Sequence, residues 1–325
     1  MKYLSYISLA LAVILSGCAD TADLPAENED ERVIMVPFSI GAAEYECDDA
    51  TKSLAPYIPD VENLIYDIWV VQYSSRGVLL PRSTFHYRTT MPGALVVGGI
   101  EYAGSTSEGF ALVESTEPCT VCFIANMGDN VPEWPDNIYA FQEIMMPVLS
   151  TDASQKLDRT PMCGYYHGPI THGSSVDVSL GRMITRLNVV INNQTGSDIT
   201  DLVVALTNTP RYAHIYPHTD TTPMNDAEKE GTRINRDAGI SLAAGETKNL
   251  YYYIAPNLYG AAWPTTLWTT CNVAGTPMQG GMILGDSVPD PSEQDVYPPV
   301  TPEGRDLRLY PNNQYTFTIN YVDNK

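Results

Sequence analysis

Cys18 carries the clearest chemistry in this sequence, because it ends a Leu-Ser-Gly-Cys motif close to the start of the chain. The run before the motif, residues 3–15, carries no charge. It is too short for a permanent transmembrane helix, which needs about 20 apolar residues, and it is typical of a cleaved secretory signal. The small residue before Cys18 favours signal peptidase II. We therefore predict a lipoprotein signal peptide over residues 1–17 and lipidation of Cys18; an ordinary signal peptide with an incidental cysteine is the alternative.

The segment that follows, residues 18–31, is dominated by carboxylates. Its acidic residues are Asp20, Asp23, Glu27, Glu29, Asp30 and Glu31. With almost no large apolar side chain, the segment cannot bury enough surface to fold. Its like charges favour an extended conformation. We expect a solvated acidic tether between the lipid and the folded part of the chain.

The composition of the whole chain indicates a β-rich protein that does not bind nucleic acid. Eighteen Lys and Arg against 39 Asp and Glu give a formal net charge of −21 in 325 residues, which argues against a nucleic-acid partner. The 21 Tyr and 24 Pro, beside 44% hydrophobic residues, are typical of strands separated by many turns. The length exceeds one typical domain of about 100–200 residues.

Alternating apolar residues predict a series of strands. The first, residues 33–40, has an apolar face formed by Ile34, Val36, Phe38 and Ile40. Pro37 cannot donate to a central ladder, so it marks an edge or a bulge. Residues 64–73 are apolar on both faces, which favours a central position in a sheet. The last strand has the cleanest alternation, with Tyr315, Phe317, Ile319 and Tyr321 on one face.

Strand spacing predicts an all-β fold of two consecutive β-sandwich domains, residues 32–175 and 176–325. A strand over residues 176–180 would open the second domain. The next strand would be half-buried, because Leu187, Val189 and Ile191 alternate with Arg186, Asn188 and Asn192. Helical spacing is clear in one place only, where we expect a single short helix or helical loop. It is given by Ile138, Phe141, Ile144 and Met145.

Motifs for catalysis, cofactors or metals are weak. The sequence has no nucleophile elbow, P-loop, dinucleotide fingerprint or zinc-protease helix motif, so we expect neither an enzyme nor a cofactor. His214 and His218 lie near Asp220, but their proline-rich loop favours surface histidines over a metal site. Cys119 and Cys122 form a CxxC in a strand-like run, without the second pair that zinc requires. Five cysteines remain besides the lipidated one, so at most two disulfides can form, with a pairing that cannot be read: Cys47, Cys119, Cys122, Cys163 and Cys271.

Aromatic residues offer an alternative function of a different class. The run of tyrosines at 251–253, with Trp263 and Trp268, could form a platform on which sugar rings stack. Strand alternation places only some of these side chains outward, which favours core packing. The alternative is a cell-surface glycan-binding lipoprotein that does not polymerise.

Three stretches resemble signature segments of the Bacteroidales fimbrillins. They are residues 123–129 (FIANMGD), 179–189 (SLGRMITRLNV) and 253–260 (YIAPNLYG). Together with the motif at Cys18 they span nearly the whole chain. The resemblance implies two transthyretin-like β-sandwich domains in a type V pilus subunit that reaches the outer membrane as a lipoprotein. It implies other pilus subunits and a host or bacterial receptor or glycan as partners, and it does not distinguish a stalk, tip or anchor role.

The resemblance also implies that a trypsin-like protease removes the first strand, after which the groove accepts a donor strand from another subunit. Between Cys18 and Arg76 the only basic residues are Arg32 and Lys52. A cut at Arg32 would shed the lipid and the tether but leave residues 33–40 in place, whereas a cut at Lys52 would remove them. Lys52 departs from the arginine that is usual in the family, which favours a tip or anchor subunit. A solvated lysine with no processing role is the other interpretation.

Overall fold

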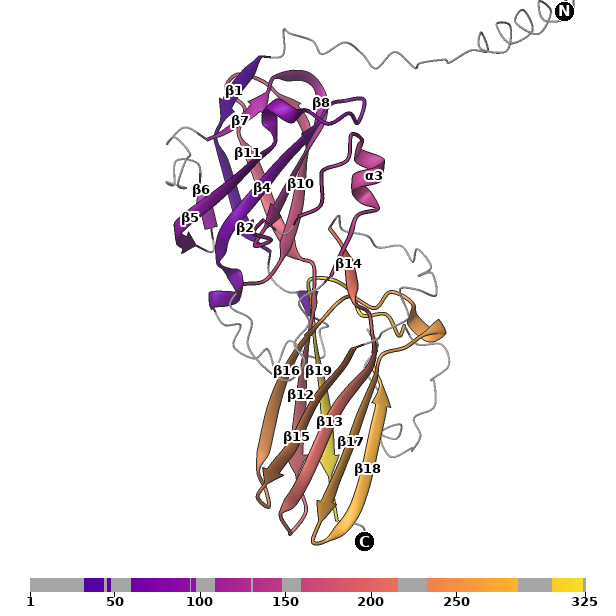
Figure 1. Ribbon diagram of the computed structural model, residues 1–325. Helices are drawn as coiled ribbons and strands as arrows, with labels where there is room; N and C mark the ends of the chain where they lie inside the picture. The colour runs from indigo at the N-terminus through magenta and orange to yellow at the C-terminus, as the bar shows by residue number, and fades with distance from the viewer. Residues whose placement is uncertain are drawn as a thin grey trace, which may run out of the picture. The chain divides into compact units, whose positions relative to one another are not determined.

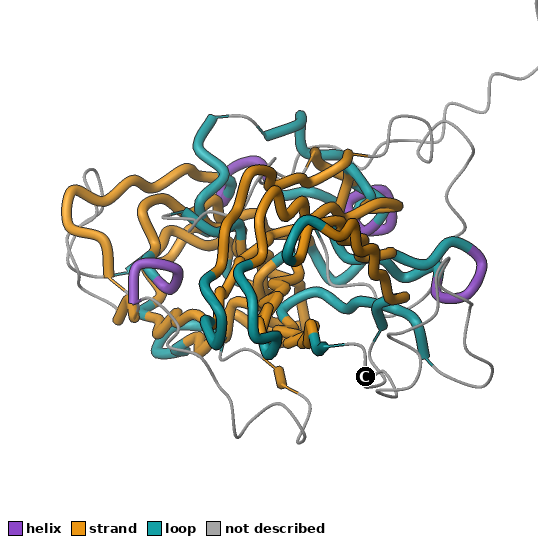
Figure 2. Tube along the Cα trace, turned by 90° about the horizontal axis from the view of Figure 1, so that it is seen from below, coloured by secondary structure: helices purple, strands orange, loops and turns teal. Residues whose placement is uncertain are grey.

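The chain is described by a computed structural model, and nearly all of its regular structure is β (Figures 1 and 2). The described residues are 32–43, 46–47, 60–93, 95–97, 109–129, 131–147, 159–215, 233–285 and 306–323. Those from Val33 onward belong to one compact unit. Cys18 and Lys52 lie outside the described residues. Within this part of the chain, no helix is long and apolar enough to cross a membrane.

The N-terminal half contains a seven-stranded sheet and a two-stranded sheet. The order of the larger sheet is β5-β4-β8-β10-β11-β2-β6. Its strands are β2 (Phe38–Ala42), β4 (Ile65–Tyr73), β5 (Phe85–Gly93), β6 (Leu95–Val97), β8 (Ser115–Ala125), β10 (Met162–Ile170) and β11 (Val176–Arg182). The smaller sheet pairs β1 (Val33–Val36) with β7 (Phe110–Val113) in antiparallel fashion.

The seven-stranded sheet curls around one hydrophobic core. Phe38 on β2 and Phe123 on β8 are three strands apart, which would separate them by about 14 Å in a flat sheet. Their ring centroids are 6.3 Å apart. Phe110 of the two-stranded sheet stacks on Phe38 at 3.6 Å. Both sheets therefore enclose the same core, with buried side chains from β1, β2, β4, β5, β7, β8, β10 and β11.

The C-terminal half is a sandwich of two four-stranded sheets, ordered β16-β12-β19-β3 and β15-β13-β17-β18. The first contains β3 (Glu46–Cys47), β12 (Thr185–Asn193), β16 (Thr247–Ile254) and β19 (Asn313–Tyr321). The second contains β13 (Ile199–Thr209), β15 (Arg233–Leu242), β17 (Thr266–Val273) and β18 (Thr276–Ile283). Buried side chains from both sheets form a single cluster, which confirms the all-β, sandwich-type prediction.

Short helices and one small sheet complete the described part. The predicted helix is α3 (Ile138–Gln142), which begins where the Asn137 side chain accepts a hydrogen bond from the Ala140 amide at 2.8 Å. It ends before Met145, which instead starts β9 (Met145–Pro147), the partner of β14 (Tyr212–His214). The 3-10 helices are η1 (Asp60–Asn63), η2 (Pro81–Ser83) and η3 (Gly260–Ala262).

The strand over residues 176–180 exists, but its predicted place in the second domain is wrong. It is part of β11, which pairs in parallel with β2 and in antiparallel fashion with β10. An alternating pattern predicts which face of a strand is buried, but it does not say in which sheet the strand lies. The change of sheet falls between β11 and β12, a few residues after the predicted boundary.

Candidate functional site

The predicted first strand, residues 33–40, fills the N-terminal core with one of its faces. Val36 and Ile40 are fully buried, while Val33 and Met35 on the other face are about 40% exposed. The buried face contains the four residues that the sequence predicted: Ile34, Val36, Phe38 and Ile40. At about 1.5–3 kcal/mol for each buried apolar side chain, this face contributes roughly 6–12 kcal/mol as an upper estimate. The segment therefore cannot leave the core without a large loss of stability.

Pro37 divides this segment into two strands with different partners. Before it, β1 pairs with β7; after it, β2 lies between β11 and β6. Pro37 lies between the two ladders, so its missing N–H group interrupts neither, and its carbonyl oxygen accepts a hydrogen bond from the Val176 amide at 3.0 Å. Gly109, which has a φ of +124°, packs against the backbone of Val36 and Pro37. A Cβ atom at position 109 would lie 2.1 Å from the Val36 carbonyl oxygen. The crossing between the two sheets therefore requires glycine at 109.

The strands that contact β1 and β2 are also linked to one another directly. The buried side chain of Gln72 on β4 donates to the Val113 carbonyl oxygen at 2.9 Å and accepts from the Val113 amide at 2.8 Å. It thereby ties β7 to the larger sheet without help from β1. If residues 33–40 left their place, a groove with unpaired strand edges and an apolar floor would remain. Such a groove can bind an extended peptide by β-strand addition.

The predicted processing residues stand differently in the structure. Arg32 is exposed and directly precedes β1, so a cut after it would break no strand pairing of β1. Lys52 and the lipidation site Cys18 lie outside the described residues. The structure therefore gives a position for only one of these three residues.

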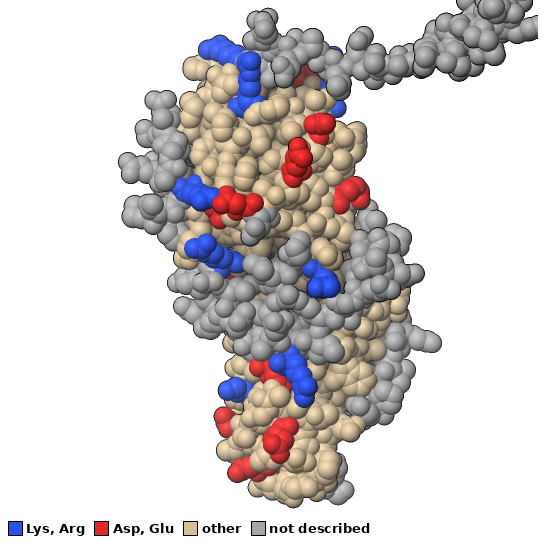
Figure 3. Space-filling model, viewed as in Figure 1, with Lys and Arg blue, Asp and Glu red and all other residues tan. Residues whose placement is uncertain are grey.

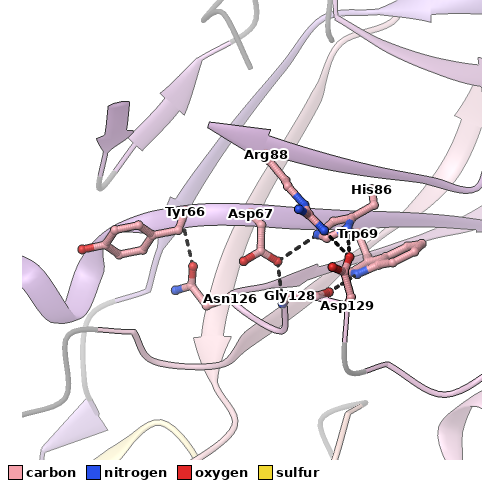
Figure 4. A network of polar contacts seen from close by, with 8 residues as sticks. All are labelled: Tyr66, Asp67, Trp69, His86, Arg88, Asn126, Gly128 and Asp129. Carbon is pink, nitrogen blue, oxygen red and sulfur yellow. Dashed lines mark hydrogen bonds and ion pairs between the residues drawn. The ribbon is translucent and has the colours of Figure 1, made fainter. Parts of the chain in front are cut away.

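The stretch 123–129 holds the end of β8 against β4 (Figure 4). Asn126, with φ of +63°, accepts from the Tyr66 amide at 2.9 Å and donates to the carbonyl oxygens of Leu64 and Thr160 at 2.9 and 2.8 Å. Gly128 accepts from the indole Nε1 of Trp69 at 2.8 Å. This stretch, which carries part of the resemblance, serves as a hydrogen-bonded corner.

A cluster of charged and aromatic side chains lies beside the same stretch. His86 is stacked on Trp69 at 4.3 Å, and its ring nitrogens lie 3.1 Å from Asp67 Oδ1 and 3.3 Å from Asp129 Oδ1 (Figure 4). Arg88 pairs with the same Asp129 carboxylate. The hydrogen bond from Arg88 is the main cause that lowers the pKa of Asp129 below its ordinary value. The cluster orients a loop with charge-assisted contacts.

The other two stretches of the resemblance supply buried polar contacts near η1. Arg186 Nη1, on β12, lies 3.4 Å from Glu62 Oε2, and the Tyr253 hydroxyl donates to the other Glu62 oxygen. All three side chains are at most 1% exposed. Arg182, at the end of β11, is also 1% exposed. The sequence pattern missed the burial of both arginines: it placed Arg186 on the polar face of a half-buried strand and made no prediction for Arg182.

The remaining candidates for chemistry are buried or scattered. Four cysteines are free and buried: Cys119, Cys122, Cys163 and Cys271. Burial raises the pKa of the Cys163 thiol to about 12. Tyr252 and Tyr253 are fully buried, whereas Trp263 and Trp268 are half-buried.

Charge and metal-ligand groups do not gather into a further site in the described part. Basic and acidic side chains are scattered over the face drawn in Figure 3. No group of three His, Cys, Asp or Glu among the described residues could hold a metal ion. His214 lies in β14, while His218 and Asp220 fall outside the described residues.

Comparison with known proteins gives similarity at the level of structure. No protein-family model matches this chain, and no curated protein matches it by sequence. A "putative cell adhesion protein" from Parabacteroides distasonis has a TM-score of 0.59 and 12% identity, covering 89% of this chain and 88% of that chain. A fimbrial assembly protein from the same species has a TM-score of 0.46 and 12% identity, covering 89% and 92%. A fimbrial anchor protein from Porphyromonas gingivalis has a TM-score of 0.41 and 11% identity, covering 76% and 82%.

The first of these similarities spans most of both chains, although the sequences are only 12% identical. The all-β architecture expected from the resemblance to fimbrillins is confirmed. This chain therefore shares its fold with the Parabacteroides distasonis protein.

Proposed function

We propose that this chain is a surface-exposed lipoprotein subunit of a fimbria that acts in fimbria assembly and adhesion. The observation that carries the proposal is the first strand, residues 33–40, whose apolar face completes the N-terminal core at the start of the compact unit that begins at Val33. The fold shared with the Parabacteroides distasonis protein, whose name is "putative cell adhesion protein", supports it. Its partners would be other fimbrial subunits and a surface receptor or glycan.

Assembly would proceed by donor-strand exchange. A protease cut after Lys52 removes β1, β2 and β3, which leaves the edges of β7, β11, β6 and β19 unpaired and uncovers the apolar core. An extended segment of another subunit then occupies the groove, because it satisfies the same backbone groups and buries a similar apolar face. A cut after Arg32 has a different result, since it releases the tether while the groove stays filled.

The anchor would be the lipid on Cys18, and the chain would lie at the surface of the outer membrane. The acidic tether, residues 18–31, separates the lipid from β1. Because the lipid and the first strand precede Lys52 in the chain, one cut releases both. A chain that is never cut there remains anchored with its own strand in place, which corresponds to an anchor or tip subunit.

The test is controlled proteolysis of the full chain with a trypsin-like protease. Mass spectrometry should detect a cut after Lys52, and electrophoresis without heating should show a ladder of polymers. The Lys52→Gln variant should lose the ladder, whereas Arg32→Gln should retain it. Monomers that persist after the first strand has left would contradict the stalk role.

Binding of a glycan by a chain that does not polymerise is the second candidate. Trp263 and Trp268 are half-buried, and the Trp263 ring contacts Tyr259 edge-on at 6.0 Å. A partly exposed aromatic pair can stack against sugar rings. A glycan array should then show binding that Trp263→Ala or Trp268→Ala removes, and equal signals from all three proteins would exclude this function.

A further inference from the structure

Arg182 connects three segments that are far apart in the sequence. Its Nη1 atom donates to the Ala43 carbonyl oxygen at 2.6 Å and to Asn312 Oδ1 at 3.0 Å. Its Nη2 atom donates to Asn63 Oδ1. Ala43 directly follows β2, Asn63 ends η1, and Asn312 precedes β19. One buried guanidinium group therefore joins the N-terminal segment of the chain to the start of its C-terminal strand.

The same N-terminal segment continues onto the sheet of the other half. The Ala43 amide donates to the Leu180 carbonyl oxygen at 2.8 Å, which prolongs the pairing of β2 with β11. Further along, Glu46 and Cys47 of β3 pair in parallel with Asn313 and Gln314 at the edge of the β16-β12-β19 sheet. We call β1, β2, Ala43 and β3 together the N-terminal strap.

A second buried contact fixes η1, which follows the strap in the chain, to the C-terminal half. Glu62 of η1 accepts hydrogen bonds from Arg186 on β12 and Tyr253 on β16. Buried charged groups tolerate the loss of a partner poorly, since the group that remains keeps its desolvation cost. The contacts of Arg182 and of Glu62 therefore hold the start of β12 and β19 in a fixed relation to the strap.

We infer that the N-terminal strap couples the groove of the N-terminal half to the sheet of the C-terminal half. Occupancy of the groove by β2 and the order at the start of β19 depend on each other through Arg182, and such coupling is reciprocal. Loss of the strap removes an acceptor of Arg182 and the edge partner of β19 in one event. This coupling is a property of the intact chain, and only its use in assembly rests on the proposed function.

The coupling also specifies the segment that could replace the strap. Four apolar residues at alternate positions would fill the groove, but they would not reach Arg182 or β19. A complete replacement is an extended peptide of another subunit about fifteen residues long, the length of the stretch 33–47. It presents a carbonyl oxygen where Ala43 has one and a strand edge that pairs with residues 313–314.

Hydrogen exchange of the intact full chain tests the coupling from its C-terminal side. Asn312→Gly removes the oxygen that accepts from the Arg182 amide and from its Nη1 atom, while glycine tolerates the φ of +57°. Asn208→Gly is a matched control, because Asn208 has φ of +58° and donates from its side chain to the Pro264 carbonyl oxygen. Asn312→Gly should speed exchange of the amides of residues 39–43 at least tenfold, and Asn208→Gly should leave them unchanged.

The coupling is wrong if Asn312→Gly speeds exchange at the start of β19 and leaves residues 39–43 at the wild-type rate. Equal acceleration by Asn208→Gly would also overturn it, because the effect would then be general destabilisation. Should Asn312→Gly fail to fold, Asn63→Ala removes a different acceptor of Arg182 and must give the same regional pattern. Failure of the proposed function has another signature: no polymers form after the strap is lost, although coupling in the intact chain is present.

Discussion

Replacement of Phe38 by alanine should destabilise the protein far more than any change on the exposed face of the same segment. Phe38 is 6% exposed, stacks on Phe110 at 3.6 Å and lies 6.3 Å from Phe123. Truncation of a buried phenylalanine costs about 3–5 kcal/mol, and loss of the aromatic contacts accounts for roughly 0.5–1.5 kcal/mol of such a cost. The total free energy of unfolding of a domain is only about 5–15 kcal/mol. The variant should therefore lose a large part of its stability.

Urea unfolding followed by circular dichroism measures this difference, with Met35→Ala as the control. Met35 lies on β1 but is 40% exposed, so its truncation should cost less than about 1 kcal/mol. The midpoint for Phe38→Ala should fall well below that of Met35→Ala, with a similar slope for both. A difference of under about 1 kcal/mol between the two variants would refute the claim that this strand completes the core.

Three further predictions address the glycine crossing, acid stability and thiol reactivity. Gly109→Ala should lower the free energy of unfolding in urea by at least about 2 kcal/mol more than Gly173→Ala does. A Cβ atom at 109 would meet the Val36 carbonyl oxygen, whereas one at 173 would meet nothing within 4 Å. Similar losses for the two variants would contradict a tight crossing. The hydrogen bond from Arg308 lowers the pKa of Asp306 from 3.8 to about 2, so its ionised form stabilises the fold above pH 4 and this contribution is lost as the pH falls from about 4 to about 2. Asp306→Asn should therefore lower the unfolding midpoint at pH 7 and leave it unchanged at pH 2, and an equal loss at both values would refute the assignment. Burial should keep the thiols of Cys119, Cys122, Cys163 and Cys271 unreactive to iodoacetamide in the native protein, so rapid native alkylation of Cys163 would contradict its position in the core.

The sequence predicted strands and their buried faces better than their partners. Period-2 spacing identified the face of the first strand, because burial of alternate residues follows from strand geometry alone. It could not show that Pro37 marks a change of sheet or that residues 176–180 join the first sheet, since pairing depends on contacts between distant segments. The short helix was found at Ile138, but its extent was not, because a turn and a strand follow at once.

The polar contacts of the site were missed for a physical reason. Arg186 and Asn188 alternate with apolar residues and were expected on a solvated face, yet they are 1% and 3% exposed. For Arg186 the partner is Glu62, more than a hundred residues away in the chain, and this contact makes its burial tolerable. A single arginine in a strand carries no signal of such a partner. The three stretches that resemble fimbrillins were the only indication, and they include Arg182, Arg186 and Tyr253.

The most direct test of the account is exchange of the strap in solution. The full chain is cut after Lys52 and mixed with an excess of a synthetic peptide of residues 33–47, and native mass spectrometry follows the complex. The account predicts that the peptide displaces the N-terminal fragment and that a peptide with Phe38→Ala does so much less. Retention of the original fragment, or equal uptake of both peptides, would contradict the claim that this segment is a replaceable strand.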